Sequence, residues 1–243
     1  MVERYTEGSA SGAQTQSMTI TLITGANKGL GLETTRRLID AGHTVYAGMR
    51  NLENGDAARA LGATAVQLDV TDDASVSAAL ASLPALDVLV NNAGIVGKRI
   101  APEDVGADTL RDLFETNVYS IARVTKAALP LLTASSNPVI VNVSSGLGFP
   151  RFVTDPDRVE STFATLDYGS AKAAVIMLSL QYSKALPGIR INSVDPGYTA
   201  TDLNGNSGPQ TVTEGTDAIV AMATIAADGP TGTFSDREGV VAY

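Results

Sequence analysis

The stretch "TITLITGANKGLG" (residues 19–31) joins a short apolar run to three glycines. The run 19–24 has the length and apolarity of a buried strand. Gly25 permits a tight turn, Gly29 lets the backbone approach a pyrophosphate, and Gly31 lets a following helix pack closely. The N–H groups at the start of that helix attract an anion. The stretch therefore predicts a strand, a nucleotide-binding turn and a helix, in that order.

The same alternation continues along the chain. Further apolar runs of strand length lie at 43–48, 63–69, 86–91, 137–144, 189–194 and near 231–236. Amphipathic stretches of helical period separate them, for example at 107–132. Strands that alternate with helices through short links predict a parallel sheet with helices on both faces. We expect an α/β Rossmann fold, with a doubly wound sheet of about seven strands, in a single domain over residues 18–243.

The composition excludes several classes of function. The net charge of −9 over 243 residues does not suit a surface for nucleic acids or anionic membranes. The chain has no cysteine, which excludes disulfides, thiolate metal sites and a cysteine nucleophile. The single histidine, His43, cannot build a histidine triad or a metal cluster by itself. No metal is predicted.

The N-terminal segment is polar, and the sequence contains no long apolar run. Residues 1–17 lack the apolar core of a secretion signal, and we expect a flexible tail or a cloning remnant there. No run approaches the roughly 20 apolar residues of a membrane span. A cytoplasmic protein is expected.

The motif "YGSAKAA" places Tyr168 four residues before Lys172, with only small side chains between them. On a helix these two residues share one face. A free tyrosine loses its proton near pH 10, and an adjacent ammonium favours the phenolate. The spacing therefore suggests an acid–base pair, provided that the rest of the chain builds a site around it.

The end of the second predicted strand indicates which dinucleotide is bound. An NAD-binding fold places an acidic residue there for the ribose hydroxyls. This chain instead has Met49 followed by Arg50, and Lys28 lies within the glycine turn. Two cations suit a 2′-phosphate, so NADP is favoured over NAD. The alternative is that both cations are ordinary solvated charges.

Five motifs together resemble one family. They are "TGANKGLG" (24–31), "NNAG" (91–94), "NVSS" (142–145), "YGSAK" (168–172) and "DPGYTAT" (195–201). Their order and spacing are similar to those of the single-domain short-chain dehydrogenases/reductases, and the resemblance runs from Thr19 to about Phe234. "TGANKG" and "GMRN" further resemble the NADPH-dependent carbonyl reductases.

The resemblance implies a role for four catalytic residues. Tyr168 would be the general acid that protonates the carbonyl oxygen during reduction. Lys172 would hold the ribose of the nicotinamide and lower the pKa of the phenol. Ser145 would hydrogen-bond the substrate oxygen, with Ser144 as the neighbour most easily confused with it. Asn117 would link Lys172 to solvent through water.

The resemblance also implies contacts with the cofactor. The implied residues are Gly25, Asn27, Lys28, Gly29, Leu30, Gly31, Arg50, Asp69, Val70, Asn91, Ala93, Gly94, Tyr168, Lys172, Pro196, Gly197, Thr199 and Thr201. Asp69 and Val70 would contact the adenine, and Asn91 the adenosine side. Thr199 would contact the carboxamide by its backbone, and Thr201 would contact phosphate.

The expected function is an NADPH-dependent oxidoreductase that reduces a ketone or an aldehyde to an alcohol, or catalyses the reverse reaction, on a small molecule. A sugar epimerase or dehydratase of the extended relatives is disfavoured, because no residues remain for a C-terminal substrate domain. An NADP-binding redox sensor without chemistry is the alternative from another class. Such proteins typically lose the tyrosine and lysine that this chain keeps.

Two long connections, 146–167 and 198–215, follow strands and should emerge at the edge where ligands bind. The first is longer than is common in the family. It could shape the substrate pocket, or cover the helix faces by which family members form homodimers and homotetramers, leaving a monomer. It could also be a surface loop without a role. Phe149, Phe152 and Phe163 could line a pocket or anchor the loop.

Overall fold

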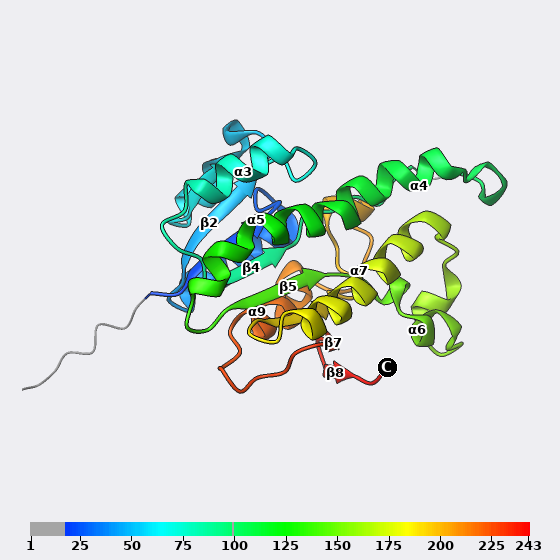
Figure 1. Cartoon of the computed structure of the whole chain (residues 1–243). Coiled ribbons are helices and arrows are strands. Elements are labelled where there is room, and N and C mark those ends of the chain that lie inside the picture. The colour runs from blue at the N-terminus through cyan, green and yellow to red at the C-terminus, as the bar shows by residue number, and fades with distance from the viewer. Residues whose placement is uncertain (1–17, 99) are drawn as a thin grey trace, which may run out of the picture.

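The computed structural model describes residues 18–98 and 100–243, which form an eight-stranded sheet flanked by helices (Figure 1). The sheet order is β3-β2-β1-β4-β5-β6-β7-β8. Every pairing is parallel except that of β8 with β7. The strands are β1 (Ile20–Thr24), β2 (Thr44–Met49), β3 (Thr64–Gln67), β4 (Val88–Asn91), β5 (Val139–Val143), β6 (Arg190–Val194), β7 (Phe234–Asp236) and β8 (Gly239–Val241).

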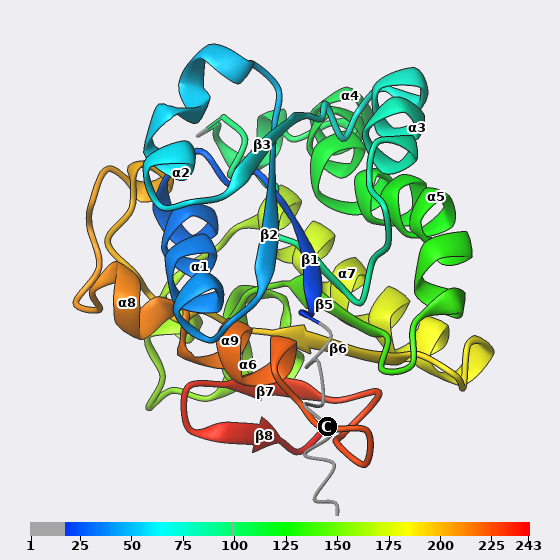
Figure 2. The same ribbon diagram turned by 90° about the vertical axis from the view of Figure 1, so that its left-hand side faces the viewer.

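The helices cover both faces of this sheet (Figure 2). They are α1 (Gly29–Asp40), α2 (Asp56–Ala60), α3 (Asp73–Ala81), α4 (Ala107–Phe114), α5 (Ser120–Ala134), α6 (Pro150–Thr154), α7 (Leu166–Ala185), α8 (Val212–Gly215) and α9 (Asp217–Ala223). One apolar core joins the strands to α1, α2 and α9, and a second joins them to α3 and α5. The predicted α/β architecture is confirmed.

The order of the strands fixes where a ligand can bind. The chain runs outward from β1 to β3 and then returns to place β4 on the other side of β1. Helices that leave β1 and β4 therefore diverge, which opens a crevice at the carboxyl ends of these strands. The glycine turn after β1 and the NNAG motif after β4 both lie at this crevice.

The structure adds one strand to the predicted seven. β8 is a three-residue antiparallel strand whose residues are mostly exposed. β8 itself contains only two apolar residues, Val240 and Val241, which is fewer than the roughly four to eight of a recognisable strand run, so the sequence pattern did not reveal it. Residues 1–17, for which a tail was predicted, lie outside the described residues. None of the helices in the described part of the chain combines the length and apolarity that crossing a membrane requires.

The single helix predicted over 107–132 is interrupted. A π-helical turn at Glu115–Tyr119 separates α4 from α5. Single π-turns are often found at functional sites, and this one carries Asn117. The long connection 146–167 contains regular secondary structure. It contains α6 and two short 3₁₀ turns, at Gly146–Gly148 and Val159–Thr162.

Candidate functional site

The glycine turn has the shape of a phosphate cradle. Gly25 and Gly29 adopt φ values of +66° and +55°, which favour glycine. A Cβ atom at Gly31 would lie 2.3 Å from the carbonyl oxygen of Gly25, so no larger residue fits there. Asn27 and Leu30 are half-buried within the same turn. The residues therefore fit the backbone approach to a dinucleotide that the sequence predicted.

Side chains from β1 and β4 hold this turn in place. The Asn92 side-chain amide donates to the carbonyl oxygens of Thr24 (2.9 Å) and Gly25 (3.1 Å). The Thr24 hydroxyl accepts from the backbone N–H groups of Asn92 and Ala93, both at 3.0 Å. Sequence reasoning assigned no role to Asn92 or to the side chain of Thr24. Their places at the ends of β4 and β1 become informative once these strands are known to pair.

The predicted adenosine end combines a cation with a carboxylate. Arg50 follows β2 and is exposed, and Asp69 follows β3. Burial would raise the pKa of Asp69, but hydrogen bonds from Thr71 and the charges of Arg50 and Arg123 hold it below its ordinary value. Val70 is buried in the core, so its side chain is not available to a ligand.

Lys28, the other predicted phosphate ligand, makes an ion pair in this structure. Its Nζ lies 3.0 Å from Asp202 Oδ2, and both side chains are more than 60% exposed. Exposed pairs of this kind contribute only about 0–1 kcal/mol. An incoming phosphate could therefore displace Asp202 from Lys28 at little energetic cost.

The structure directs the Asn91 side chain away from the crevice. Its amide donates to Asn142 Oδ1 (2.8 Å), and the amide of Asn142 donates in turn to Ser179 Oγ (2.8 Å). All three side chains are buried and link β4, β5 and α7. A contact from Asn91 to the adenosine side would have to come from its main chain.

Tyr168 and Lys172 meet on one face of α7, as the spacing predicted. Lys172 Nζ lies 5.6 Å from the centre of the Tyr168 ring. The Tyr168 hydroxyl shares a side-chain hydrogen bond with Ser145. Ser144 instead is buried, and its hydroxyl donates to the carbonyl of Lys172 at 2.9 Å. Of the two neighbouring serines, Ser145 is the one placed beside the phenol.

The expected net lowering of the pKa of this phenol does not occur in this structure, where burial is the largest influence. The effect of Lys172 by itself stays a prediction. Burial raises the pKa of Tyr168 to about 12, the hydrogen bond from Ser145 opposes this, and the charge of Asp195 adds to it. Burial also lowers the pKa of Lys172 to about 8, against the influence of Asp195. Lys172 Nζ donates to the carbonyl of Val143 (2.9 Å) rather than to the phenol.

Asn117 and Lys172 come together around Gly94. A Cβ atom at Gly94 would lie 3.3 Å from Asn117 Oδ1 and 3.6 Å from Lys172 Nζ. The Asn117 side chain accepts from the N–H of Ile95 and donates to its carbonyl, both at 2.8 Å. The π-turn therefore aims a buried amide at the start of the loop after β4, next to the lysine.

The connection after β6 lies over the glycine turn. Gly197 adopts φ +68° beside Pro196, and the Thr199 hydroxyl donates to the Pro196 carbonyl at 2.8 Å. The side chain of Thr199 is therefore already engaged, which leaves its backbone for a ligand. A Cβ atom at Gly29 would lie 4.0 Å from Thr201 Cβ, so Thr201 faces the predicted phosphate position.

The three phenylalanines of the long connection have different surroundings. Phe149 and Phe152 are buried with Phe234, and Phe149 stacks on Phe234 with ring centres 4.7 Å apart. These two anchor the connection to the sheet. Phe163 is 43% exposed, and its ring meets that of Tyr198 edge-on at 5.9 Å. The two long connections therefore touch each other through Phe163 and Tyr198. Phe163 precedes Tyr168 by five residues in the sequence.

Comparisons with known proteins show the family of this chain. A sequence profile of the short chain dehydrogenase family matches residues 19–211. The chain is 28% identical to (+)-neomenthol dehydrogenase of Capsicum annuum, over 95% of this chain and 99% of that protein. It is 30% identical to (-)-isopiperitenone reductase of Mentha piperita, over 91% of this chain and 97% of that protein.

Among solved structures, the NADPH-bound carbonyl reductase from chicken fatty liver is similar with a TM-score of 0.80. The two chains are 27% identical, and the match covers 93% of this chain and 99% of that one. The sheet order, the glycine turn and the grouping of Ser145, Tyr168 and Lys172 are thus accompanied by similarity along most of the sequence. The chain belongs to the short chain dehydrogenase family and resembles its carbonyl reductases.

Proposed function

We propose that this oxidoreductase uses NADPH to reduce a ketone or an aldehyde on a small apolar molecule. The observation that carries the proposal is the meeting of Ser145, Tyr168 and Lys172 at the same sheet edge as the glycine turn. Similarity to a dehydrogenase, a reductase and an NADPH-bound carbonyl reductase supports this reaction class.

The cofactor would lie along the carboxyl edge of the sheet. Arg50 and Lys28 would hold the 2′-phosphate, the turn from Gly25 to Gly31 the pyrophosphate, and Lys172 the ribose of the nicotinamide. A bound NADPH supplies the hydride, so the task left to the protein is to position the substrate and to manage one proton. These assignments can be tested singly, because the residues come from different elements.

The proton would come from Tyr168. With a pKa of about 12 in this structure, the phenol is protonated at neutral pH, which is the form that an acid needs. Ser145 would hydrogen-bond the carbonyl oxygen and place it beside the phenol. Lys172, with a pKa of about 8, is mostly cationic at pH 7 and favours the phenolate that proton donation leaves behind. Reduction is the direction in which a protonated phenol would serve as the acid.

Arg50→Asp is expected to weaken binding of NADPH about 10- to 100-fold, because a hydrogen bond between charged groups contributes about 1.5–3 kcal/mol. Binding of NADH, which has no 2′-phosphate, should change far less. Quenching or enhancement of dinucleotide fluorescence measures both affinities. Arg111→Asp is the matched control, because Arg111 is also exposed but lies on α4. Equal losses for the two cofactors would refute the phosphate contact.

The contact of Phe163 with Tyr198 suggests where the substrate enters. If Phe163 contacts the ring of a cyclic apolar ketone, Phe163→Ala removes an aromatic contact worth about 0.5–1.5 kcal/mol, so KM should rise about three- to tenfold. The value of kcat should change less, because Phe163 holds no proton. A panel of ketones of increasing ring size measures the effect. An unchanged KM for every ketone would exclude Phe163 from the entrance.

The alternative of an NADP-binding redox sensor predicts binding without turnover. Loss of NADPH absorbance at 340 nm is the standard readout, and a ketone panel separates the two proposals. Binding of NADPH with no oxidation by any carbonyl compound would favour the sensor. The convergence of Ser145, Tyr168, Lys172 and Asn117 in one place supports the enzyme.

The oligomeric state and the cellular location of this protein stay predictions. An apolar groove of about 670 Å³ lies along α7, lined in part by Ile176, Met177 and Leu180. The connection 146–167 flanks this groove through residues 148–151, while Met177 stays 55% exposed. A homodimer, a homotetramer and a monomer all stay open, and sedimentation would distinguish them. A cytoplasmic location and a single domain over 18–243 are likewise proposed.

A further inference from the structure

Asp195 lies between two turns of the candidate site and bonds to both. It follows β6 and is only 3% exposed. Its Oδ1 accepts from the backbone N–H of Gly197 at 2.9 Å, and the carboxylate also accepts from the backbone N–H of Gly146. Gly146 is next to Ser145, and Gly197 belongs to the turn whose residues were expected to contact the cofactor. One buried side chain therefore fixes the distance between these two turns.

A second carboxylate approaches the same point. A Cβ atom at Gly146 would lie 2.7 Å from Asp195 Oδ2 and 2.6 Å from Glu160 Oε1. Glu160 is 9% exposed and pairs with Arg158 at 3.1 Å. A residue larger than glycine at position 146 would force Asp195 and Glu160 away from this turn. The connection 146–167 therefore reaches the catalytic serine through Glu160 and Gly146.

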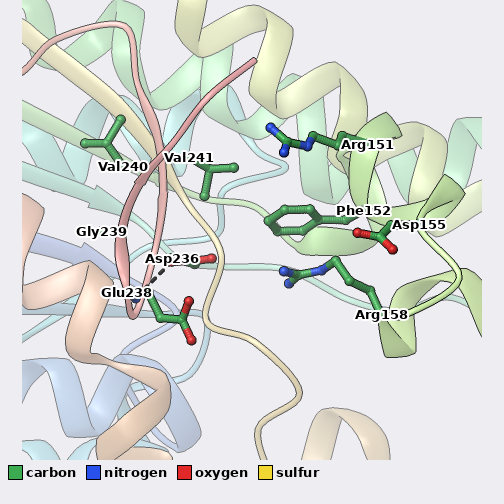
Figure 3. A pocket seen from close by; sticks show the side chains of 9 residues that line it. All are labelled: Arg151, Phe152, Asp155, Arg158, Asp236, Glu238, Gly239, Val240 and Val241. Carbon is green, nitrogen blue, oxygen red and sulfur yellow. Dashed lines mark hydrogen bonds between the residues drawn. The ribbon is translucent and has the colours of Figure 1, made fainter.

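The outer side of this cluster is a pocket of about 370 Å³ between the connection and the β7–β8 hairpin (Figure 3). Arg158 stacks on Phe152, with its guanidinium carbon 3.4 Å from the ring centre, and extends toward Asp236. Among the described residues, no ion pair joins Asp195 itself to a cation. Arg158 pairs with Glu160 instead, so the buried Asp195 carboxylate interacts with Arg158 and Lys172 only at longer range.

The groups that face Asp195 determine how readily it ionises. Burial raises the pKa of Asp195 to about 6, the N–H groups of Gly197 and Gly146 lower it, and Glu160 and Asp236 raise it again. The cations that face it are Arg158 from the connection and Lys172 from α7. Tyr168 also feels its charge. Because burial destabilises the ionised form of Asp195, keeping this carboxylate charged costs folding free energy. This cost suggests that the charge has a function.

We propose that ionised Asp195 is a positioning residue, which holds Ser145 in register with the Pro196–Gly197 turn and keeps Lys172 cationic. This inference rests on the proposed reductase function. Two acceptor oxygens are needed for the two N–H groups, and the negative charge raises the pKa of Lys172. Protonation removes the charge and one good acceptor. Turnover should then fall because the reacting groups lose their alignment.

The stability of the fold should respond to pH in the opposite sense to activity. The pKa of Asp195 is higher in the folded protein (about 6) than its ordinary value of 3.8. Between these values the folded state binds more protons than the unfolded state, so the free energy of unfolding falls as pH rises. The contribution is complete below about pH 4 and lost above pH 6. The charged form is thus the less stable and the more active one.

Asp195→Asn tests the proposal, because asparagine keeps the shape but loses the charge and one acceptor. We expect kcat of the parent protein to fall below about pH 6, and kcat of the variant to be about tenfold or more lower at pH 7.5, without that acidic limb. The pH dependence of thermal unfolding between pH 4 and 6 should weaken in the variant. If Asp195→Asn lost activity only because its fold is destabilised, its melting temperature at pH 7.5 would be lower than that of the parent protein.

Asp236→Asn is the matched control, since Asp236 faces the same cluster but bonds to neither turn. It should keep the parental rate at pH 7.5 and move the acidic limb to lower pH, because a negative neighbour of Asp195 is lost. A parental rate and an unchanged acidic limb in Asp195→Asn would overturn the proposal. If the parent protein turned over no carbonyl compound, the proposed function would fail, and an unchanged unfolding profile in Asp195→Asn would separately overturn the role of Asp195.

Discussion

Tyr168→Phe is expected to lower the rate of carbonyl reduction by about 10²–10⁴-fold, the usual contribution of a general acid. Phenylalanine fills the same space beside Lys172 and Ser145 but has no proton to give. NADPH binding should weaken by no more than about two- to tenfold, because a phenol-to-benzene change removes only one neutral hydrogen bond of about 0.5–1.5 kcal/mol. Single-turnover absorbance measures the rate, and dinucleotide fluorescence measures binding.

Tyr182→Phe provides the control on the same helix. Tyr182 is also partly buried in α7, and burial raises its pKa too, but it packs against the core formed with α3 and α5. Its loss should leave the rate of reduction unchanged. Turnover by Tyr168→Phe at near the parental rate would remove Tyr168 from the role of acid. A loss of NADPH binding in parallel with the loss of turnover would indicate a structural role instead.

Gly31→Ala is expected to weaken NADPH binding about ten- to a hundredfold. The added methyl carbon would lie 2.3 Å from the Gly25 carbonyl oxygen and 2.6 Å from the Asn92 amide nitrogen. The first of these is backbone, so the turn itself must move away from α1. Overpacking of this kind costs about 1–3 kcal/mol, and each 1.4 kcal/mol is tenfold in affinity. Titration of NADPH with fluorescence detection measures the loss, and thermal unfolding shows how far the fold is weakened.

Gly188→Ala is the matched control, since a Cβ atom at Gly188 would meet nothing within 4 Å and its φ lies outside the left-handed region. It should bind NADPH as the parent does. If Gly31→Ala kept parental affinity, the turn at 25–31 would not be the pyrophosphate site. If both variants lost affinity equally, the effect would not be specific to the turn.

The sequence predicted the elements of this fold well, because their signals are local. Each predicted parallel strand is an apolar run, and the glycine turn lies where the first run ends. The spacing of Tyr168 and Lys172 placed them correctly on one face of α7. The π-turn at Glu115–Tyr119 had no such signal, since its residues are compatible with a continuous helix. The exposed strand β8, with three residues, was too short to give a strand signal in the sequence.

The linear order of residues was sufficient to predict the α/β architecture and the meeting of Tyr168 and Lys172 on one face of α7, because turns, periodicity and i,i+4 neighbours depend on nearby residues. The linear order could not predict which groups of the candidate site carry a proton at a given pH. The pKa values of Tyr168 and Lys172 and the two hydrogen bonds of Asp195 arise only after folding. Each depends on water being excluded by packing between segments that are far apart in the chain, and desolvation acts on a group only when its distant neighbours are in place.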